Sequence, residues 1–489
     1  MQHNHSGYSK LVLMAVTLGL CLNQEISAQS KQQKTFKAGA STSVITPKIG
    51  TSINGNFQDG TSSHIHDDTH ARSIVLDDGS TKLAIVVADL CMIGRDILDE
   101  AKAIASRATN IPVKNMMMSA THTHSGGTAC GVFQSEPDPA YQSFVTERIA
   151  DAVIRANGNL QPARIGFGAG SEPSQVFNRR WHMKPGSMTP NPFGEKDQVR
   201  MNPPAGSPDL IGPAGPIDPE VSVLYIQSLQ GRPIGLLANY SLHYVGGVKS
   251  GSVSADYFGM FCNKMKELLG PGDRDYPFVP IMSNGTSGDI NNIDFRGAQW
   301  KPSGPYAQME RVANIVAEEV HEVVNGMKFY DWLPLGVEQE EIKLGVRKAS
   351  PKEIDRAKKL LQGTEGKILT DRDQIYARES IKLQEYPDQV PLLITAMKIG
   401  DLAIASIPCE VFVEIGLEIK EKSPFKKTFT VSLANGYNGY LPTPKHHELG
   451  GYETWRARSS YLETQASPKI TSTLFGLMNK LHSGTQSQK

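Results

Sequence analysis

The sequence lacks the features that mark several large classes of protein. Its 489 residues contain 50 Lys and Arg against 50 Asp and Glu, so there is no excess of positive charge. A general nucleic-acid-binding protein needs that excess to neutralise phosphates, and we therefore expect no nucleic-acid partner. With 39% hydrophobic and 20% charged residues, the composition is that of a globular rather than a disordered chain.

Long hydrophobic runs are also scarce. The run at residues 11–22 follows Lys10 and precedes a small-residue stretch that ends at Ala28, which is the layout of a cleavable export signal. We predict a signal peptide over residues 1–28 and a mature protein that is periplasmic or secreted. The run is too short for a transmembrane segment, and no later run is long enough. Cys21 would allow lipid attachment, but the bulky Leu20 before it makes lipoprotein anchoring the weaker alternative.

Cysteine is rare after the predicted signal peptide, where only Cys91, Cys130, Cys262 and Cys409 occur. Their spacings contain no CxxC pair and none of the density of a disulfide-stabilised secreted domain. An exported chain could still pair them, so their disulfide status stays open. Four buried thiols fit the spacing better.

Hydrophobic periodicity alternates between strand and helix patterns along the chain. Two β-rich runs flank Asp78-Gly79 in residues 71–90, as in a hairpin. Apolar residues recur at three- and four-residue spacing in residues 141–156, as in a helix. Residues 171–219 are rich in Pro, Gly and Asn and are expected to form a long loop. We predict an α/β fold with mixed β-sheets and flanking helices, in a single domain over residues 36–480 followed by a disordered tail over residues 481–489.

Candidate metal ligands occur where apolar strand patterns end. His122 and His124 lie two residues apart before two glycines, so a period of two would place both imidazoles on one face. His243 ends a second apolar run, and Glu410 follows a third, where we expect it to open a short helix. Each residue alone has a simpler explanation: a local hydrogen bond, a core histidine or a helix N-terminal charge. Together, two imidazoles and a carboxylate make a normal ligand set for catalytic Zn²⁺ at strand ends and loops.

Several motifs in this order resemble those of one family, the neutral ceramidases of the neutral/alkaline non-lysosomal type. These motifs are THTHSGG at residues 121–127, FNRR at residues 177–180, and NGYNGYLPTPKHHELGGYE at residues 435–453. The resemblance covers most of the chain after the predicted signal peptide. It implies a zinc-dependent amidase with a small-molecule or lipid substrate, ceramide-like by family default.

The resemblance also implies individual roles. It implies His122, His243 and Glu410 as zinc ligands and Tyr440 as a fourth, atypical ligand. The remaining pocket residues that it implies are His124 as a catalytic pocket residue, Arg179 as an oxyanion or substrate contact, and Tyr452 as a pocket hydroxyl. Because an imidazole titrates near working pH, we expect His124 to transfer a proton.

Two departures from the family pattern affect the expected mechanism. Where the family has a serine, this sequence has Asn291 in SGDINNI. An amide cannot act as a nucleophile, although it can hydrogen-bond near an oxyanion. A zinc-activated water needs no serine. The family also carries an immunoglobulin-like C-terminal domain, for which the residues after Glu453 are too few.

We therefore expect a zinc-dependent hydrolase that cleaves an N-acyl amide bond with a zinc-activated water. Three carboxylates, Asp89, Asp256 and Asp289, either orient ligand imidazoles or cap loops, and the sequence leaves both roles open. Two alternatives stay open. The same zinc scaffold could act on a carbohydrate or another non-lipid substrate, because a fold and a metal site do not determine the reaction. The chain could also be a non-catalytic binding protein.

Overall fold

The structure is a computed structural model that describes residues 1–2, 34–272, 276–297 and 300–486. From Phe36 onward the chain forms one compact unit. The predicted signal peptide, including Cys21, lies outside the described residues apart from its first two. The helices of the described residues include none that is long and apolar enough to cross a membrane.

The larger sheet has nine strands in the order β16-β14-β13-β8-β1-β5-β6-β7, with β18 paired to β8. The pairs β6–β7 and β14–β16 are parallel, and the other pairs are antiparallel. Its strands are β1 (Lys37–Val44), β5 (His70–Asp77), β6 (Lys82–Ala88), β7 (Met116–Ala120), β8 (Gln161–Ser171), β13 (Glu220–Ser228), β14 (Pro233–Tyr240), β16 (Val279–Asn284) and β18 (Phe329–Tyr330).

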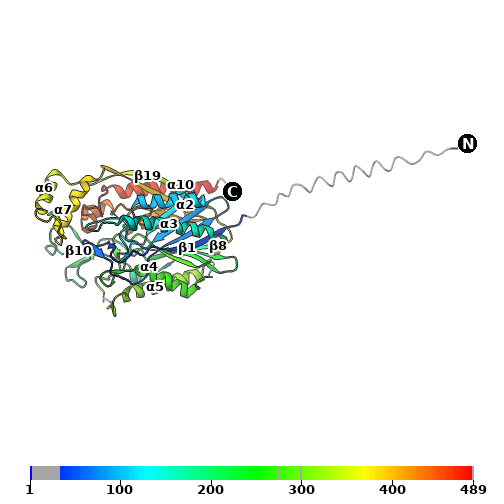
Figure 1. Cartoon of the computed structure of the whole chain (residues 1–489), viewed down its shortest axis with the longest axis horizontal. Helices are drawn as coiled ribbons and strands as arrows, with labels where there is room; N and C mark the ends of the chain where they lie inside the picture. Colours follow the sequence, from blue (N-terminus) through cyan, green and yellow to red (C-terminus); the bar gives the residue numbers. More distant parts are fainter. Residues whose placement is uncertain (3–33, 273–275, 298–299, 487–489) are drawn as a thin grey trace. The chain divides into compact units, whose positions relative to one another are not determined.

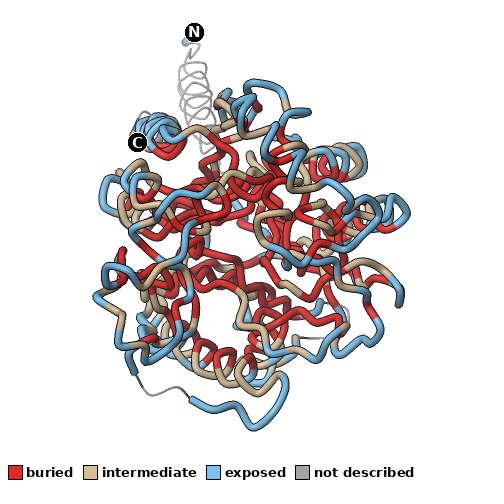
Figure 2. Tube along the Cα trace, turned by 90° about the vertical axis from the view of Figure 1, so that its left-hand side faces the viewer, coloured by how far each residue is buried: buried red, intermediate tan, exposed pale blue. Residues whose placement is uncertain are grey.

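A second sheet packs against one face of the first. Its strand order is β19-β20-β21-β23, comprising β19 (Leu335–Gly345), β20 (Gln389–Ile399), β21 (Leu402–Ser406) and β23 (Lys427–Val431). One buried apolar cluster joins the two sheets, with Ile74 and Leu224 from the larger sheet beside Met397 and Phe429 from the smaller one. The hydrophobic contact between the facing sheets therefore forms the centre of the fold, where Figure 2 shows the buried part of the chain.

Helices cover the outer face of each sheet (Figure 1). On the larger sheet lie α2 (Arg95–Thr109), α3 (Pro139–Gly158), α4 (Asp256–Leu269) and α5 (Ala307–Asn325), and on the smaller sheet lies α10 (Ala466–Gln486). The helix α3 illustrates why the spacing of apolar residues predicted a helix here. Asp138 caps its N-terminus, Pro139 follows, and Val145, Ile149 and Val153 form its buried stripe. The predicted α/β class with mixed sheets is confirmed.

Three local predictions need correction. Residues 171–219 are not a structureless loop: they contain β9 (Phe177–Asn178) and a small sheet of β10 (Arg180–Met183), β11 (Val199–Met201) and β12 (Leu210–Pro213). These strands are too short to show alternation. Glu410 lies in β22 (Glu410–Val411), and the helix α8 (Val413–Lys422) begins only after it. The expected irregular tail from residue 481 is helical as far as Gln486.

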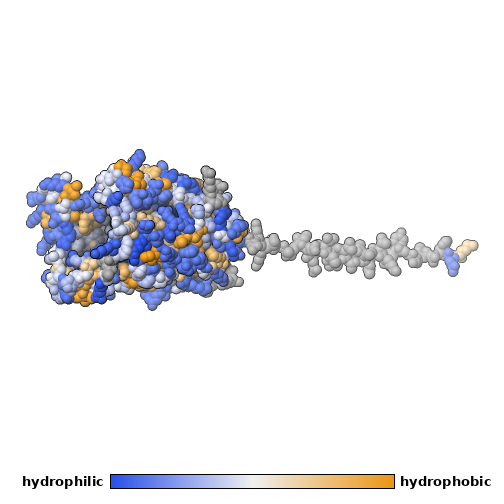
Figure 3. Space-filling view, turned by 90° about the horizontal axis from the view of Figure 1, so that it is seen from below, coloured by the Kyte–Doolittle hydropathy of each residue, from blue (hydrophilic) through white to orange (hydrophobic). Residues whose placement is uncertain are grey.

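The four later cysteines are free thiols, and three of them are buried. On the face that Figure 3 displays, hydrophobic residues form small groups separated by hydrophilic ones. At one end of the unit lie β10 and the helices α6 (Pro351–Leu360) and α7 (Arg372–Lys382) (Figure 1). This end carries the loops that surround the candidate site.

Candidate metal centre

His122 lies just beyond β7 in a strained backbone conformation. Its φ is 74°, in the left-handed region that β-carbon-bearing residues rarely adopt. The imidazole Nδ1 lies 2.7 Å from the carbonyl oxygen of Cys91, which orients the ring and leaves Nε2 facing the pocket. Strain of this kind persists where the surrounding structure holds a functional side chain in place.

Two further imidazoles converge on His122. The ring of His243, which follows β14, lies 4.5 Å from that of His122, centroid to centroid, and its Nδ1 lies 3.0 Å from the carbonyl oxygen of Ser287. Nε2 of His124 lies 3.1 Å from Nε2 of His122. The His124 ring also stacks on Tyr244 at 3.7 Å. The strand ends thus bring three imidazoles together, as the sequence predicted.

The candidate carboxylate ligand, Glu410, comes from the C-terminal part of the chain. Glu410 pairs directly with Tyr440 across the parallel bridge between β22 and β24 (Tyr440–Leu441). Glu410 Oε2 lies 3.2 Å from Nε2 of His122, and Glu410 Oε1 accepts a hydrogen bond of 3.1 Å from the hydroxyl of Tyr437. Tyr437 was not predicted from the sequence, although it lies in the first NGY of NGYNGY, three residues before the predicted Tyr440.

The donor set fits a metal ion. One ligand atom each from His122, His243 and Glu410 lie within 4.8 Å of one another, and all three residues are buried. Within the described part of the chain, His243 Nε2 and Glu410 Oε2 have no hydrogen-bond partner. A buried polar atom left unsatisfied costs about 1–3 kcal/mol, and more when it is charged. A cation between these atoms would remove that cost, and imidazole and carboxylate are ordinary Zn²⁺ ligands.

The pKa shift of His243 agrees with this fit. Burial, with the positive charge of Arg179 and the other histidines, lowers the pKa of His243 and keeps it neutral, as a metal ligand must be. Burial also lowers the pKa of His124. For His122, burial acts in the same direction, but the Glu410 carboxylate outweighs it and raises the pKa. In the metal-free chain Glu410 thus favours the protonated His122 imidazole, and a metal ion bound at Nε2 would displace that proton.

Behind Tyr440 lies a buried ionic cluster. Arg179 Nε and Arg180 Nη1 donate to the two oxygens of Glu453 at 3.0 and 2.6 Å. Arg179 Nη2 donates to the hydroxyl of Tyr440 at 3.1 Å and to the carbonyl oxygen of Gly288 at 2.8 Å. Arg179 therefore lies next to the candidate ligands. Three of its hydrogen bonds, however, are made to other groups of the protein, so they do not point at a substrate.

Asn291 is not part of this cluster. Its Nδ2 donates to Asn202 Oδ1 at 2.6 Å, and its Oδ1 accepts from the backbone of Ile293. It lies in β17 (Ile290–Asn291), which pairs with β9, and it is not among the residues that line the small pocket at the histidines. The short β9–β17 pairing decides this orientation, and neither strand is long enough to be read from periodicity.

The three carboxylates Asp89, Asp256 and Asp289 hydrogen-bond to groups other than the candidate ligand imidazoles. Asp256 accepts backbone N–H groups of Val245, Gly246 and Tyr257, Asp289 accepts from Asn178 and Val413, and Asp89 binds Arg72. The imidazoles of His122 and His243 are instead oriented by the backbone carbonyl oxygens of Cys91 and Ser287. Backbone carbonyls carry no residue signature, so the sequence could not identify them.

The pocket at the ligand cluster is small. Its volume is about 20 Å³, and its wall includes Phe133, Tyr452 and Ser459 besides His122, His124 and Glu410. Tyr452, predicted as a hydroxyl donor, therefore lies beside the ligands. A larger cleft of about 340 Å³ shares Tyr452 as a wall.

Comparisons with known proteins agree with the motifs. The family described as neutral/alkaline non-lysosomal ceramidase, N-terminal, matches residues 36–313. Neutral ceramidase A of Dictyostelium discoideum is 23% identical over 271 residues, which cover 50% of this chain and 33% of that protein. Neutral ceramidase of Pseudomonas aeruginosa is 26% identical over 193 residues, which cover 37% of this chain and 25% of that protein.

The fold comparison covers more of the chain. The crystal structure of the Pseudomonas aeruginosa enzyme superposes with a TM-score of 0.70 at 16% identity, over 92% of this chain and 75% of that one. A structure described as ceramidase complexed with C2 gives a TM-score of 0.68 over 92% of this chain and 76% of that one, also at 16% identity. In sequence, the chain spans about a third or less of the relatives named above. The family match over more than half of the chain, together with this fold, shows that the chain belongs to the neutral/alkaline non-lysosomal ceramidase family.

Proposed function

We propose that this chain is a zinc-dependent hydrolase that cleaves an N-acyl amide bond. The observation that carries the proposal is the buried convergence of His122, His243 and Glu410, with two of their ligand atoms unpartnered among the described residues. These three residues would hold Zn²⁺, with the hydroxyl of Tyr440 as a fourth ligand. When bound, the ion supplies Lewis-acid activation of water and of the scissile carbonyl.

His124 is the proposed proton-transfer residue. Its Nε2 lies 3.1 Å from Nε2 of His122, so it borders the place where the amide would react. Burial favours its neutral form, which can accept a proton from the attacking water. The resulting imidazolium can then donate that proton to the leaving amine. Stacking on Tyr244 holds the ring in one orientation.

Two residues are proposed to act on the developing oxyanion. Tyr452 lines the pocket and can donate its hydroxyl hydrogen there. Three donor contacts of Arg179 go to Glu453, Tyr440 and Gly288. We propose that its main role is to orient the Tyr440 hydroxyl, while its positive charge still acts on the pocket. Asn291 takes no part in this scheme, since its amide is bonded elsewhere.

The substrate class rests on the family. The relatives are named neutral ceramidases, so a ceramide-like N-acyl lipid is the first candidate. Attack by water requires no serine nucleophile, which agrees with asparagine at position 291. Export of the mature protein remains a prediction from residues 1–28.

The test combines metal content with an activity panel. We expect the purified protein to contain about one zinc per chain and to release fatty acid from an N-acylsphingosine, and chelation to abolish that release. His122→Ala and His243→Ala should lose both zinc and activity. His321→Ala on α5 is a matched control and should keep both. A wild-type protein without zinc would refute the metal centre. A zinc-loaded protein that releases reducing sugar from polysaccharide fragments but never cleaves an amide would refute the amidase.

A further inference from the structure

Two cavities lie on either side of one aromatic wall. The inner pocket, of about 20 Å³, is lined by three of the predicted ligands, His122, Glu410 and Tyr440, and the outer cleft, of about 340 Å³, lies next to it. Tyr452 lines both. Phe133 lines the inner pocket, and Phe57 lines the outer cleft.

Phe57 lines the outer cleft and packs against two aromatic residues that line the inner pocket. Its ring packs edge-on against Phe133, with centroids 4.9 Å apart, and against Tyr452, with centroids 5.9 Å apart. It also meets Tyr376 of α7 at 6.1 Å. The side chain therefore lies between the outer cleft and the two aromatic rings that border the ligands.

The inner pocket cannot hold a substrate as it stands. A cavity of about 20 Å³ has room for roughly one water molecule, whereas an N-acyl amide has many more atoms. Part of the wall must move, and the ligand side chains are restrained: carbonyl oxygens hold His122 and His243, and Tyr437 holds Glu410. The Phe57 ring is held by edge-on aromatic contacts, so it can rotate without breaking a hydrogen bond of its side chain.

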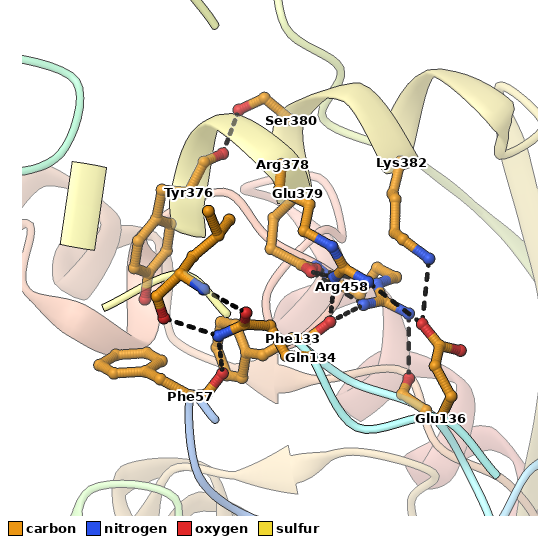
Figure 4. Close-up of polar contacts among 12 residues, drawn as sticks. Phe57, Phe133, Gln134, Glu136, Tyr376, Arg378, Glu379, Ser380, Lys382 and Arg458 are labelled. Atoms are coloured by element: carbon orange, nitrogen blue, oxygen red, sulfur yellow. Dashed lines mark hydrogen bonds and ion pairs between the residues drawn. The ribbon is translucent and has the colours of Figure 1, made fainter. Parts of the chain in front are cut away.

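The backbone around Phe57 is anchored, so a change can be confined to its side chain. Gln134 Nε2 donates to the carbonyl oxygens of Phe57 and Leu369, at 2.9 Å each, and Gln134 Oε1 accepts from the Leu369 backbone at 2.8 Å (Figure 4). The adjacent carbonyl of Phe133 accepts from Arg458 Nη2 at 2.6 Å, and Arg458 is paired with the buried Glu379 (Figure 4).

The outer cleft suits the chain of an amphipathic substrate. Met188 and Met201 line it from the β10–β11–β12 region and Trp455 lines it from the opposite segment, while the charged residues Asp197, Arg200 and Arg372 line other parts of it. Asp197 joins the two sides, because its Oδ2 accepts from Trp455 Nε1 at 2.7 Å. Methionine and aromatic side chains offer adaptable apolar contact.

We propose that the two cavities are one substrate pocket divided by Phe57. The amide reaches the ligand cluster past this ring, an unbranched apolar chain stays in the outer cleft, and Phe57 determines how bulky a group can pass. This inference rests on the proposed amidase function.

The test compares Phe57→Ala with Phe193→Ala. Phe193 packs on Tyr376 in the same aromatic cluster but lines neither cavity. For a series of N-acyl amides of increasing bulk beside the carbonyl, we expect Phe57→Ala to raise the ratio of kcat/KM for the bulkiest over the smallest by about tenfold or more. Phe57→Trp should lower the same ratio, and Phe193→Ala should leave it unchanged. An equal effect of Phe57→Ala on every substrate would overturn the proposal.

A second readout needs no catalysis. Cys91 lines the inner pocket, while Cys262 is buried in α4 away from it. Phe57→Ala should speed alkylation of Cys91 by a bulky maleimide, quantified by peptide mass spectrometry, and leave Cys262 unchanged. If no variant cleaves an amide but this labelling increases, the amidase proposal fails and the partition stands. If labelling stays at the wild-type rate in a folded Phe57→Ala protein, and in Phe57→Leu, the partition fails.

Discussion

Glu410 and Glu453 are buried carboxylates beside the same pocket, and they differ in how they are satisfied. Both oxygens of Glu453 accept from arginines, whereas Glu410 has one oxygen bonded to Tyr437 and the other without a hydrogen bond among the described residues. Burying a charge is costly unless it is paired. The two arginines satisfy Glu453 within the fold, whereas Glu410 Oε2 contacts the His122 imidazole without a hydrogen bond among the described residues. The first arrangement stabilises the chain, and the second is the one that we propose a cation would complete.

The largest expected effect is on catalysis by Glu410→Gln. Removing the carboxylate charge should abolish zinc retention and lower amide hydrolysis by at least about 10²–10³-fold, the scale for losing one group that stabilises the transition state. The unfolding free energy of the metal-free protein should also fall, because the buried pair of Glu410 with the His122 imidazole loses its carboxylate charge. Metal analysis, kinetics and urea unfolding measure the three quantities. Glu418→Gln, in an exposed pair with Lys422, is the control. A Glu410→Gln protein that retains zinc and full activity would contradict the proposed difference between Glu410 and Glu453.

Glu453→Gln should have the largest effect on stability. It leaves two buried guanidinium groups without their counter-charge, and breaking a buried ion pair from one side costs about 3–5 kcal/mol. We expect the urea midpoint to fall accordingly, while Glu418→Gln should change the unfolding free energy by less than about 1 kcal/mol. Equal stability of the two variants would show that the arginines do not depend on Glu453.

Tyr437→Phe tests whether the single hydrogen bond to Glu410 positions that ligand. Loss of a hydrogen bond to a metal-ligating group typically weakens metal binding about 10–100-fold. We expect a loss of this size in zinc affinity, measured by competition with a chromophoric chelator. Tyr461→Phe removes a similar buried hydroxyl that bonds to Asn438 and should leave the affinity unchanged. Identical zinc affinities of the two variants would remove Tyr437 from the site.

The smallest effect concerns acid stability. Burial opposes the ionised form of Glu453, but Arg180 and Arg179 outweigh it and lower the carboxyl pKa below its usual 4.5. The resulting stabilisation is present above pH 4.5 and is lost as the pH falls through the folded-state pKa. Between pH 6 and pH 3 the wild type should therefore lose more unfolding free energy than Glu453→Gln. Parallel pH profiles of the two proteins, from denaturant titrations, would contradict the lowered pKa.

Candidate site residues could be proposed from the sequence because metal and acid–base chemistry follows residue type. His122, His124 and His243 were recognisable at the ends of apolar strands, and Tyr440 was recognisable from a motif. What could not be predicted were contacts made by backbone atoms or by distant side chains. The carbonyl oxygens of Cys91 and Ser287 orient the imidazoles, and the position of Asn291 depends on its bonds to Asn202 and Ile293.

The sequence by itself therefore determined the α/β class, the family and the residue types available as ligands, because hydrophobic periodicity and short motifs are local properties of the chain. Only the tertiary structure decided which buried charges are completed internally and which are left for a ligand. It also brought Phe57 between the two cavities, from a segment far from Tyr452 in the chain. Both outcomes depend on contacts between residues hundreds of positions apart in the chain, and these contacts form only when the whole domain packs.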